Sequence, residues 1–167
     1  NSATSTPVQV ALNPPSACYC ASTATDLADE DIFNVTVGTL NNSSTCATTA
    51  PGSNSVKNLY SNYTGYTGAP TGNISRGLSN SLSIQIGTCG TTPYGNGTAV
   101  FIDYNQNGLF TDAGERVYGL ATTTPGAHFE TGTFVVPVTA TPGVTRMRVI
   151  TVEFSAGTAI NPCGTYT

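Results

Sequence analysis

Apolar residues recur at every second position over several short stretches of this chain, which is the spacing of a half-buried β-strand. The clearest case is 79–86, where Leu82, Ile84 and Ile86 share one face. The longest alternation covers 145–154, and weaker strand patterns cover 8–12, 32–40, 58–67, 98–102, 116–120 and 129–138. No stretch of ten or more residues shows an apolar stripe with the 3.6-residue period of a helix. The pattern predicts an all-β domain.

Glycine and proline punctuate these stretches every 8–15 residues, which favours an antiparallel β-sandwich or barrel. Pro14 and Pro15 separate an extended lead-in, residues 1–17, from a single domain over 18–167. Four acids crowd 26–31 just before a predicted strand. We interpret them as a solvated turn or a single helical turn before the strand, with a second cation site as the alternative.

A run of oxygen-bearing residues lies between two of the predicted strands. Its candidate ligands are Asp103, Asn105, Asn107, Leu109 (through its carbonyl oxygen), Asp112 and Glu115. Hard cations such as Ca²⁺ take six to eight oxygen ligands, and one short loop can supply most of them. The sequence therefore predicts a structural calcium site in the crossing between 98–102 and 116–120.

The spacing in this loop differs from that of an EF-hand. Position 12 counted from Asp103 is Gly114, and the acid falls one residue later at Glu115. The flanking segments read as strands rather than helices. With two neutral asparagines among the ligands, we expect weak affinity, on the order of 10⁻⁴–10⁻³ M, as in extracellular modules. The alternative is a hairpin loop whose Asn and Asp side chains bond its own backbone.

Composition excludes two classes of partner. Charged residues make up 8% of the chain, and the net charge is −4 with five Lys and Arg. Nucleic-acid binding requires clustered basic residues, so it is not expected. No apolar run approaches the roughly 20 residues of a membrane span.

Cysteine usage places the protein in an oxidising compartment. The five cysteines form no C-x-x-C pair, and His128 is the only histidine, so a Cys/His zinc set is not expected. Disulfide bonds fit better. The chain begins at Asn1 without Met, which indicates an exported protein with its signal peptide removed, or a trimmed chain.

Several segments together resemble the GEVED domain, a module of secreted and cell-surface bacterial proteins. The core of the resemblance is 100–110, ending in Gly114-Glu115. Tyr19-Cys20 is similar to the family's opening step, 60–64 to its Tyr-Ser-x-Tyr-Thr step, and 145–149 with 162–164 to its late signature. The likeness covers residues 19–167.

The resemblance implies an immunoglobulin-like antiparallel β-sandwich without catalytic activity. It also implies a Cys20–Cys163 disulfide. Cys46–Cys89 is the second expected pair, which leaves Cys18 over, and Cys18–Cys46 is the alternative. The family's acidic Gly-Glu-Val-Glu-Asp segment normally follows the Cys-Gly step, but this sequence stops at Thr167, so its last strand is expected to be absent.

Nothing in the sequence resembles a catalytic set. There is no G-x-S-x-G elbow, His128 is expected to be exposed, and Glu130 and Glu153 are expected to face solvent. Arg146 and Arg148 share one strand face and are expected to pair with such acids. Four tyrosines are candidate ligand contacts, and core packing is an equally good interpretation of them: Tyr60, Tyr63, Tyr66 and Tyr94.

Three functional hypotheses follow. The first is an adhesive or structural surface module, stabilised by calcium and disulfides, that contacts surface glycans or proteins. The second is a filament subunit that exchanges strands with copies of itself, using the lead-in strand 8–12. The third is an accessory domain of a secreted hydrolase.

Overall fold

The computed structural model describes residues 19–25 and 30–166. The predicted strand 8–12, Cys18 and the first acids of 26–31 lie outside the described residues. Within these ranges the fold consists of strands joined by irregular segments, with one 3-10 turn at Gly157–Ala159. No helix in this part of the chain is long and apolar enough to cross a membrane.

One sheet contains four antiparallel strands in the order β3-β2-β4-β8. The strands are β2 (Glu30–Val37), β3 (Leu40–Ser43), β4 (Ser79–Thr88) and β8 (His128–Val135). The alternation predicted for β4 is confirmed, because Leu82, Ile84 and Ile86 are buried between more exposed neighbours. Burial of this one face is what fixes the register of β4 between β2 and β8.

The predicted strand 32–40 is instead the hairpin of β2 and β3. Gly38 has φ 57°, a left-handed conformation that a glycine adopts at little cost, and the chain reverses there. Periodicity alone misses this turn because apolar residues stand on both sides of it.

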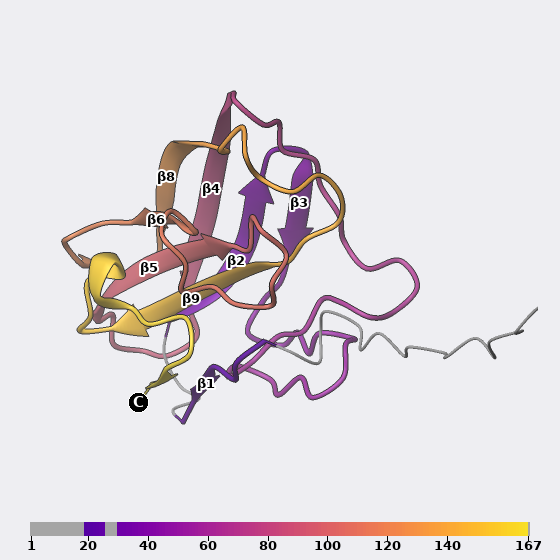
Figure 1. The fold of residues 1–167 in the computed structure, drawn as a ribbon. Helices are drawn as coiled ribbons and strands as arrows, with labels where there is room; N and C mark the ends of the chain where they lie inside the picture. The colour runs from indigo at the N-terminus through magenta and orange to yellow at the C-terminus, as the bar shows by residue number, and fades with distance from the viewer. Residues whose placement is uncertain (1–18, 26–29, 167) are drawn as a thin grey trace, which may run out of the picture.

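The second sheet is centred on β5 (Gly95–Ile102). β5 pairs antiparallel with β6 (Arg116–Gly119), with the short β7 (Thr124–Pro125) and with β9 (Met147–Glu153). A separate two-stranded pair, β1 (Thr23–Ala24) with β10 (Thr165–Tyr166), is parallel. Figure 1 shows β5 and β9 crossing in front of the first sheet.

The two sheets enclose a common core, and a second core covers the outer face of the β5 sheet. The inner core joins side chains of both sheets, among them Ile84, Val100 and Ile102. The outer core contains Phe101, Phe110 and Ile160, with Tyr19 and Tyr166 packed against it. Because both faces of β5 are covered, all but one of its residues are buried.

The expectation of an all-β fold with antiparallel sheets and disulfide bonds is confirmed. Two predicted strands change. Residues 58–67 are irregular and keep one isolated bridge, between Val56 and Tyr60. The strand predicted over 129–138 ends at Val135, because Pro137 has no N–H to donate to a sheet.

Candidate metal site

The acidic loop lies between β5 and β6, and its two end residues are buried. Asp103 follows β5 directly and is fully buried, whereas Glu115 precedes β6 and is 2% exposed. The Ile102 backbone N–H donates to the Glu115 carbonyl oxygen at 2.9 Å, which closes the base of the loop. Two carboxylates are thus carried inward by the strands that flank them.

The carboxylate of Asp103 accepts three hydrogen bonds. The backbone N–H groups of Asn107 and Gly108 donate to it at 3.2 and 3.0 Å. The third donor is the Tyr19 hydroxyl, at 2.5 Å from Oδ2. Burial raises the pKa of Tyr19, and the bond to Asp103 and its charge raise it further, so the hydroxyl remains a donor.

The exposed part of the loop is organised by its asparagines. The side-chain oxygens of Asn105 and Asn107 accept from backbone N–H groups two residues later, at 3.0 and 2.9 Å. Their side-chain amides donate to the same oxygen of Asp112, at 2.8 and 2.7 Å. The self-bonded hairpin geometry offered above as the alternative is therefore present in the structure.

Glu115 is the one acid of the loop that this arrangement leaves incompletely bonded. Its Oε1 accepts from the Tyr104 N–H at 2.9 Å. Its Oε2 is buried and has no hydrogen-bond partner among the described residues. Burial raises the pKa of Glu115 and the charges of Asp103 and Asp112 add to this, whereas the backbone N–H groups of Tyr104 and Asn105 lower it. A buried carboxylate oxygen without a donor is costly unless a cation or proton compensates it.

The donor set of the loop fits calcium in its chemistry. All six predicted ligands offer oxygen, and the three acids repel one another. Within the described ranges, however, no three His, Cys, Asp or Glu side chains are close enough to hold a metal by themselves. A cation here would depend on asparagine and backbone oxygens, which requires Asn105 and Asn107 to turn their amide oxygens inward. Leu109 has an exposed side chain, so only its carbonyl is relevant.

Arg146, directly before β9, and Arg148, on β9, attach residues 19–20 to the loop. The Arg146 guanidinium lies 5.1 Å from the ring centroid of Tyr19, which stacks on Phe110 at 4.7 Å. Arg148 lies 4.8 Å from the ring centroid of Phe110. It also donates to the carbonyl oxygens of Cys20 and Pro162, at 2.8 and 2.5 Å. The prediction that these arginines pair with acids is wrong, because carbonyls and aromatic rings surround them.

Two disulfide bonds reinforce this arrangement. Cys20 is bonded to Cys163, with their Cα atoms 5.5 Å apart, and Cys46 is bonded to Cys89. The first bond joins residues 143 positions apart and closes nearly the whole described chain into one ring. The alternative pairing of Cys18 with Cys46 is therefore excluded by the bond between Cys46 and Cys89.

Residues 97–167 match the model of the GEVED domain family. The match confirms the resemblance to the GEVED domain family over this part of the chain. No curated protein and no solved structure matches it. The matched range contains the acidic loop, Arg146, Arg148 and Cys163. Tyr19 and Cys20 precede it, yet the structure bonds both to the matched part.

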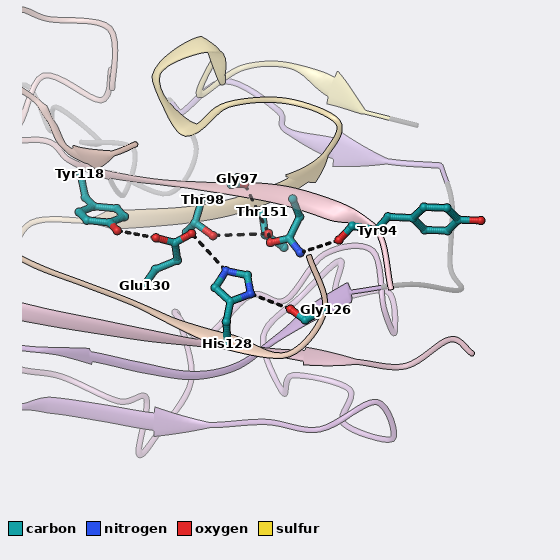
Figure 2. A network of polar contacts seen from close by, with 9 residues as sticks. Tyr94, Gly97, Thr98, Tyr118, Gly126, His128, Glu130 and Thr151 are labelled. Carbon is teal, nitrogen blue, oxygen red and sulfur yellow. Dashed lines mark hydrogen bonds and ion pairs between the residues drawn. The ribbon is translucent and has the colours of Figure 1, made fainter. Parts of the chain in front are cut away.

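A buried polar cluster forms a second candidate site of this GEVED domain, between the two sheets (Figure 2). Glu130, on β8, is 3% exposed. The Tyr118 hydroxyl of β6 donates to its Oε2 at 2.5 Å, and His128 Nε2 lies 3.2 Å from its Oε1. His128 Nδ1 also contacts the Gly126 carbonyl at 2.6 Å. The predictions of an exposed His128 and a solvent-facing Glu130 are wrong.

The Glu130 cluster joins the sheets rather than opening onto solvent. Beside it, the Thr98 hydroxyl donates to Thr151, which in turn donates to the Asn96 side-chain oxygen at 3.3 Å. Sequence periodicity misses Glu130 because it sits on a strand with polar residues on both faces. Gly132, on the same face of β8, makes room for the Tyr118 ring, because an added Cβ there would lie 3.0 Å from a carbon of that ring.

Replacing Tyr118 by Phe is expected to lower the free energy of unfolding by about 1–3 kcal/mol at neutral pH, because buried Glu130 loses a donor. Burial and the bond to Glu130 raise the pKa of Tyr118 in the folded state. The hydroxyl's contribution is therefore complete below the unfolded pKa of about 10 and declines above it. Urea unfolding at several pH values measures the difference. Tyr94→Phe, on the surface, is the matched control, and an equal effect there contradicts the prediction.

The four candidate contact tyrosines do not form one patch. Tyr60 and Tyr63 line a groove beside β9, and Tyr66 is partly buried. Tyr94 lies apart from them and packs against Phe154, with ring centroids 5.4 Å apart. The two rings are 36% and 77% exposed, so they form an aromatic pair open to solvent.

Proposed function

We propose that this GEVED domain is a non-catalytic, exported surface module, adhesive or structural, stabilised by calcium and two disulfides. The observation that carries the proposal is the buried Glu115 oxygen without a hydrogen-bond partner, at the base of a loop whose other candidate ligands all supply oxygen. A calcium ion bound there would supply the missing positive partner.

In this proposal the ion fastens three parts of the chain together. Glu115 immediately precedes β6 and Asp103 immediately follows β5, so a shared cation fixes the crossing between these strands. Asp103 also accepts a hydrogen bond from the Tyr19 hydroxyl, so an ion that fixes Asp103 also fixes the position of Tyr19. The expected affinity is weak because Asn105 and Asn107 are neutral ligands.

A non-catalytic role is supported by how the reactive residues are used. His128 is engaged with Glu130 and a backbone carbonyl inside the fold. The four cysteines that the structure describes are consumed in disulfides. Export is supported by the same bonds, since disulfides persist in oxidising compartments.

An adhesive contact is supported by the Tyr94–Phe154 pair. Phe154 keeps its aromatic ring exposed although its backbone has φ 55°, which is unfavourable for a residue with a large side chain. Exposed aromatic faces are suited to stacking on sugars and to anchoring protein contacts. Surface glycans and proteins are therefore the proposed partners. An accessory role beside a secreted hydrolase would use the same contact.

Calcium is expected to raise the stability of the chain measurably. At about 10 mM calcium and a dissociation constant on the order of 10⁻⁴–10⁻³ M, the free energy of unfolding should rise by about 1–3 kcal/mol over that in chelator. Calorimetric unfolding with calcium and with chelator measures this gain directly.

Two variants, each unfolded with calcium and with chelator, distinguish an acid that binds the metal from an acid that stabilises the loop without metal. Glu115→Gln should abolish the calcium gain and unfold no earlier than wild type in chelator, because it removes an uncompensated charge. Asp103→Ala should lose stability in chelator as well, because three donors lose their acceptor. Glu153→Gln, which changes an acid of β9 outside the loop, is the control that keeps the full gain. A calcium gain retained in Glu115→Gln, or absent from wild type, refutes the proposed metal role.

A further inference from the structure

An open groove of about 1010 Å³ runs beside β9. The β2–β3 hairpin forms one wall, the irregular segment 58–64 forms another, and β9 forms the third. β9 contacts β2 across the space between the sheets. The groove is therefore an opening in the side of the sandwich that leads toward its inner core.

The walls of the groove are apolar where they approach this core. Val35 of β2, Ile74, and Met147 and Val149 of β9 all line it and pack against the inner core. Each of these side chains is only partly buried. The groove thus exposes apolar surface that the two sheets leave uncovered.

The backbone of β9 also faces this opening. Every second residue of β9 exchanges backbone hydrogen bonds with β5. Two bonds at the ends, from Phe154 N–H to the Gly95 carbonyl and from Asp103 N–H to the Arg146 carbonyl, show which residues these are. By this alternation, Met147, Val149 and Thr151 direct their N–H and C=O groups away from β5. In the part of the chain that the structure describes, β9 pairs only with β5.

A groove with apolar walls and an unpaired strand edge is suited to an extended polypeptide, because a peptide backbone can pair with successive N–H and C=O groups of the edge while its side chains contact the walls. The lead-in segment Val8–Leu12 has the required pattern. Val8, Val10 and Leu12 alternate with Gln9 and Ala11, and the segment carries no charge. At about 3.3 Å per residue, five residues span about 17 Å, within the length of seven-residue β9.

We propose that the groove beside β9 binds Val8–Leu12 of a second copy of this chain as an added β-strand. Tyr19 is held at the start of β9 by Asp103 and Arg146. Between Leu12 and Tyr19, the Pro14-Pro15 pair favours an extended backbone. An extended linker disfavours the chain reversal that would bring this segment back onto its own groove, which favours the groove of a neighbour. This inference rests on the proposed function in its structural variant, a module that assembles with others, and it identifies the partner as a second copy of the chain.

Sedimentation of the full-length chain over the micromolar range tests the proposal, with calcium held constant. Wild type is expected to self-associate. Val10→Asp, which puts a charge on the face toward the groove, should weaken association at least about tenfold, equivalent to about 1.4 kcal/mol. Gln9→Asp adds the same charge on the opposite face and should associate as wild type does.

A change in the groove should have the same effect as a change in the segment. Val149→Pro removes a backbone N–H that faces the groove but no hydrogen bond to β5. Edge strands tolerate proline at such positions. The variant should therefore fold and remain monomeric. Val149→Thr keeps the shape and the N–H and should associate. Mixing Val10→Asp with Val149→Pro should restore a one-to-one complex, because one supplies an intact groove and the other an intact segment.

A monomeric wild type, self-association of Val10→Asp at the wild-type level, or failure of the mixture to associate overturns the proposal. A monomeric wild type that Val10→Asp destabilises identifies the chain's own segment as the occupant, which also overturns it. Cooperative unfolding of Val149→Pro shows that this variant is folded, and Val10→Asp changes a residue outside the described fold. Any of these failures leaves the calcium gain intact, so the two proposals fail separately.

Discussion

Replacing both Cys20 and Cys163 by Ala is expected to lower the free energy of unfolding by about 5 kcal/mol. The bond closes a loop of 143 residues, and the entropy that such a loop removes from the unfolded chain grows with its length. An effect of this size approaches the whole stability of many domains. Urea unfolding of wild type and the double variant measures it.

The second disulfide provides the matched comparison. Replacing Cys46 and Cys89 removes a bond that spans 43 residues, and the same model predicts a loss of about 4 kcal/mol. The Cys20–Cys163 variant should also loosen the segment around Tyr19, which amide hydrogen exchange detects. A larger loss from the Cys46–Cys89 variant contradicts the loop-length account of both bonds.

Replacing Arg148 by Met is expected to lower the free energy of unfolding by about 3 kcal/mol. The change keeps an unbranched side chain but leaves the carbonyl oxygens of Cys20 and Pro162 without their donor. It also removes the cation from the ring of Phe110. Hydrogen bonds from a charged donor contribute about 1.5–3 kcal/mol each, and a cation over an aromatic ring about 0.5–2. Denaturant unfolding again gives the measurement.

Arg146→Met, two residues earlier and directly before β9, is the control. Arg146 donates one side-chain hydrogen bond, to Thr64 Oγ1, and lies over the Tyr19 ring. Its replacement should cost about 1 kcal/mol. If the two variants lose equal stability, the carbonyl contacts of Arg148 are not what holds the two cysteine segments together.

These two predictions concern the same junction. The disulfide, Arg148 and Tyr19 all connect residues 19–24 to the C-terminal half of the chain, where the match to the GEVED domain lies. The matched range therefore includes the loop and β9, and the structure adds residues 19–24, which are bound to both. The proposed second-copy strand would leave the domain from this same junction.

Local patterns predict several elements well. The alternation of β4 follows from Leu82, Ile84 and Ile86, because one buried face imposes a two-residue period. The loop from Asp103 to Glu115 was found from its oxygen-bearing residues alone. The hairpin of β2 and β3 was missed, because a turn at Gly38 between two apolar runs does not interrupt the pattern.

Contacts between distant residues lay beyond such patterns. Tyr19 and Asp103 are 84 positions apart, and Arg148 and Cys20 are 128 apart. In the sequence, no local pattern distinguishes Tyr19 and Cys20 apart from their resemblance to the family's opening step. The burial of Glu130 likewise follows from Tyr118 arriving on another sheet.

The sequence by itself determined the all-β character, the position of the acidic loop and the chemistry of its ligands, because periodicity and residue type are local properties. Tertiary structure decided which acid of the loop lacks a hydrogen-bond partner, which arginine bonds both Cys20 and Pro162, and where the sandwich stays open. These depend on which strands come to lie side by side, and strand pairing joins residues whose separation along the chain carries no periodic signal.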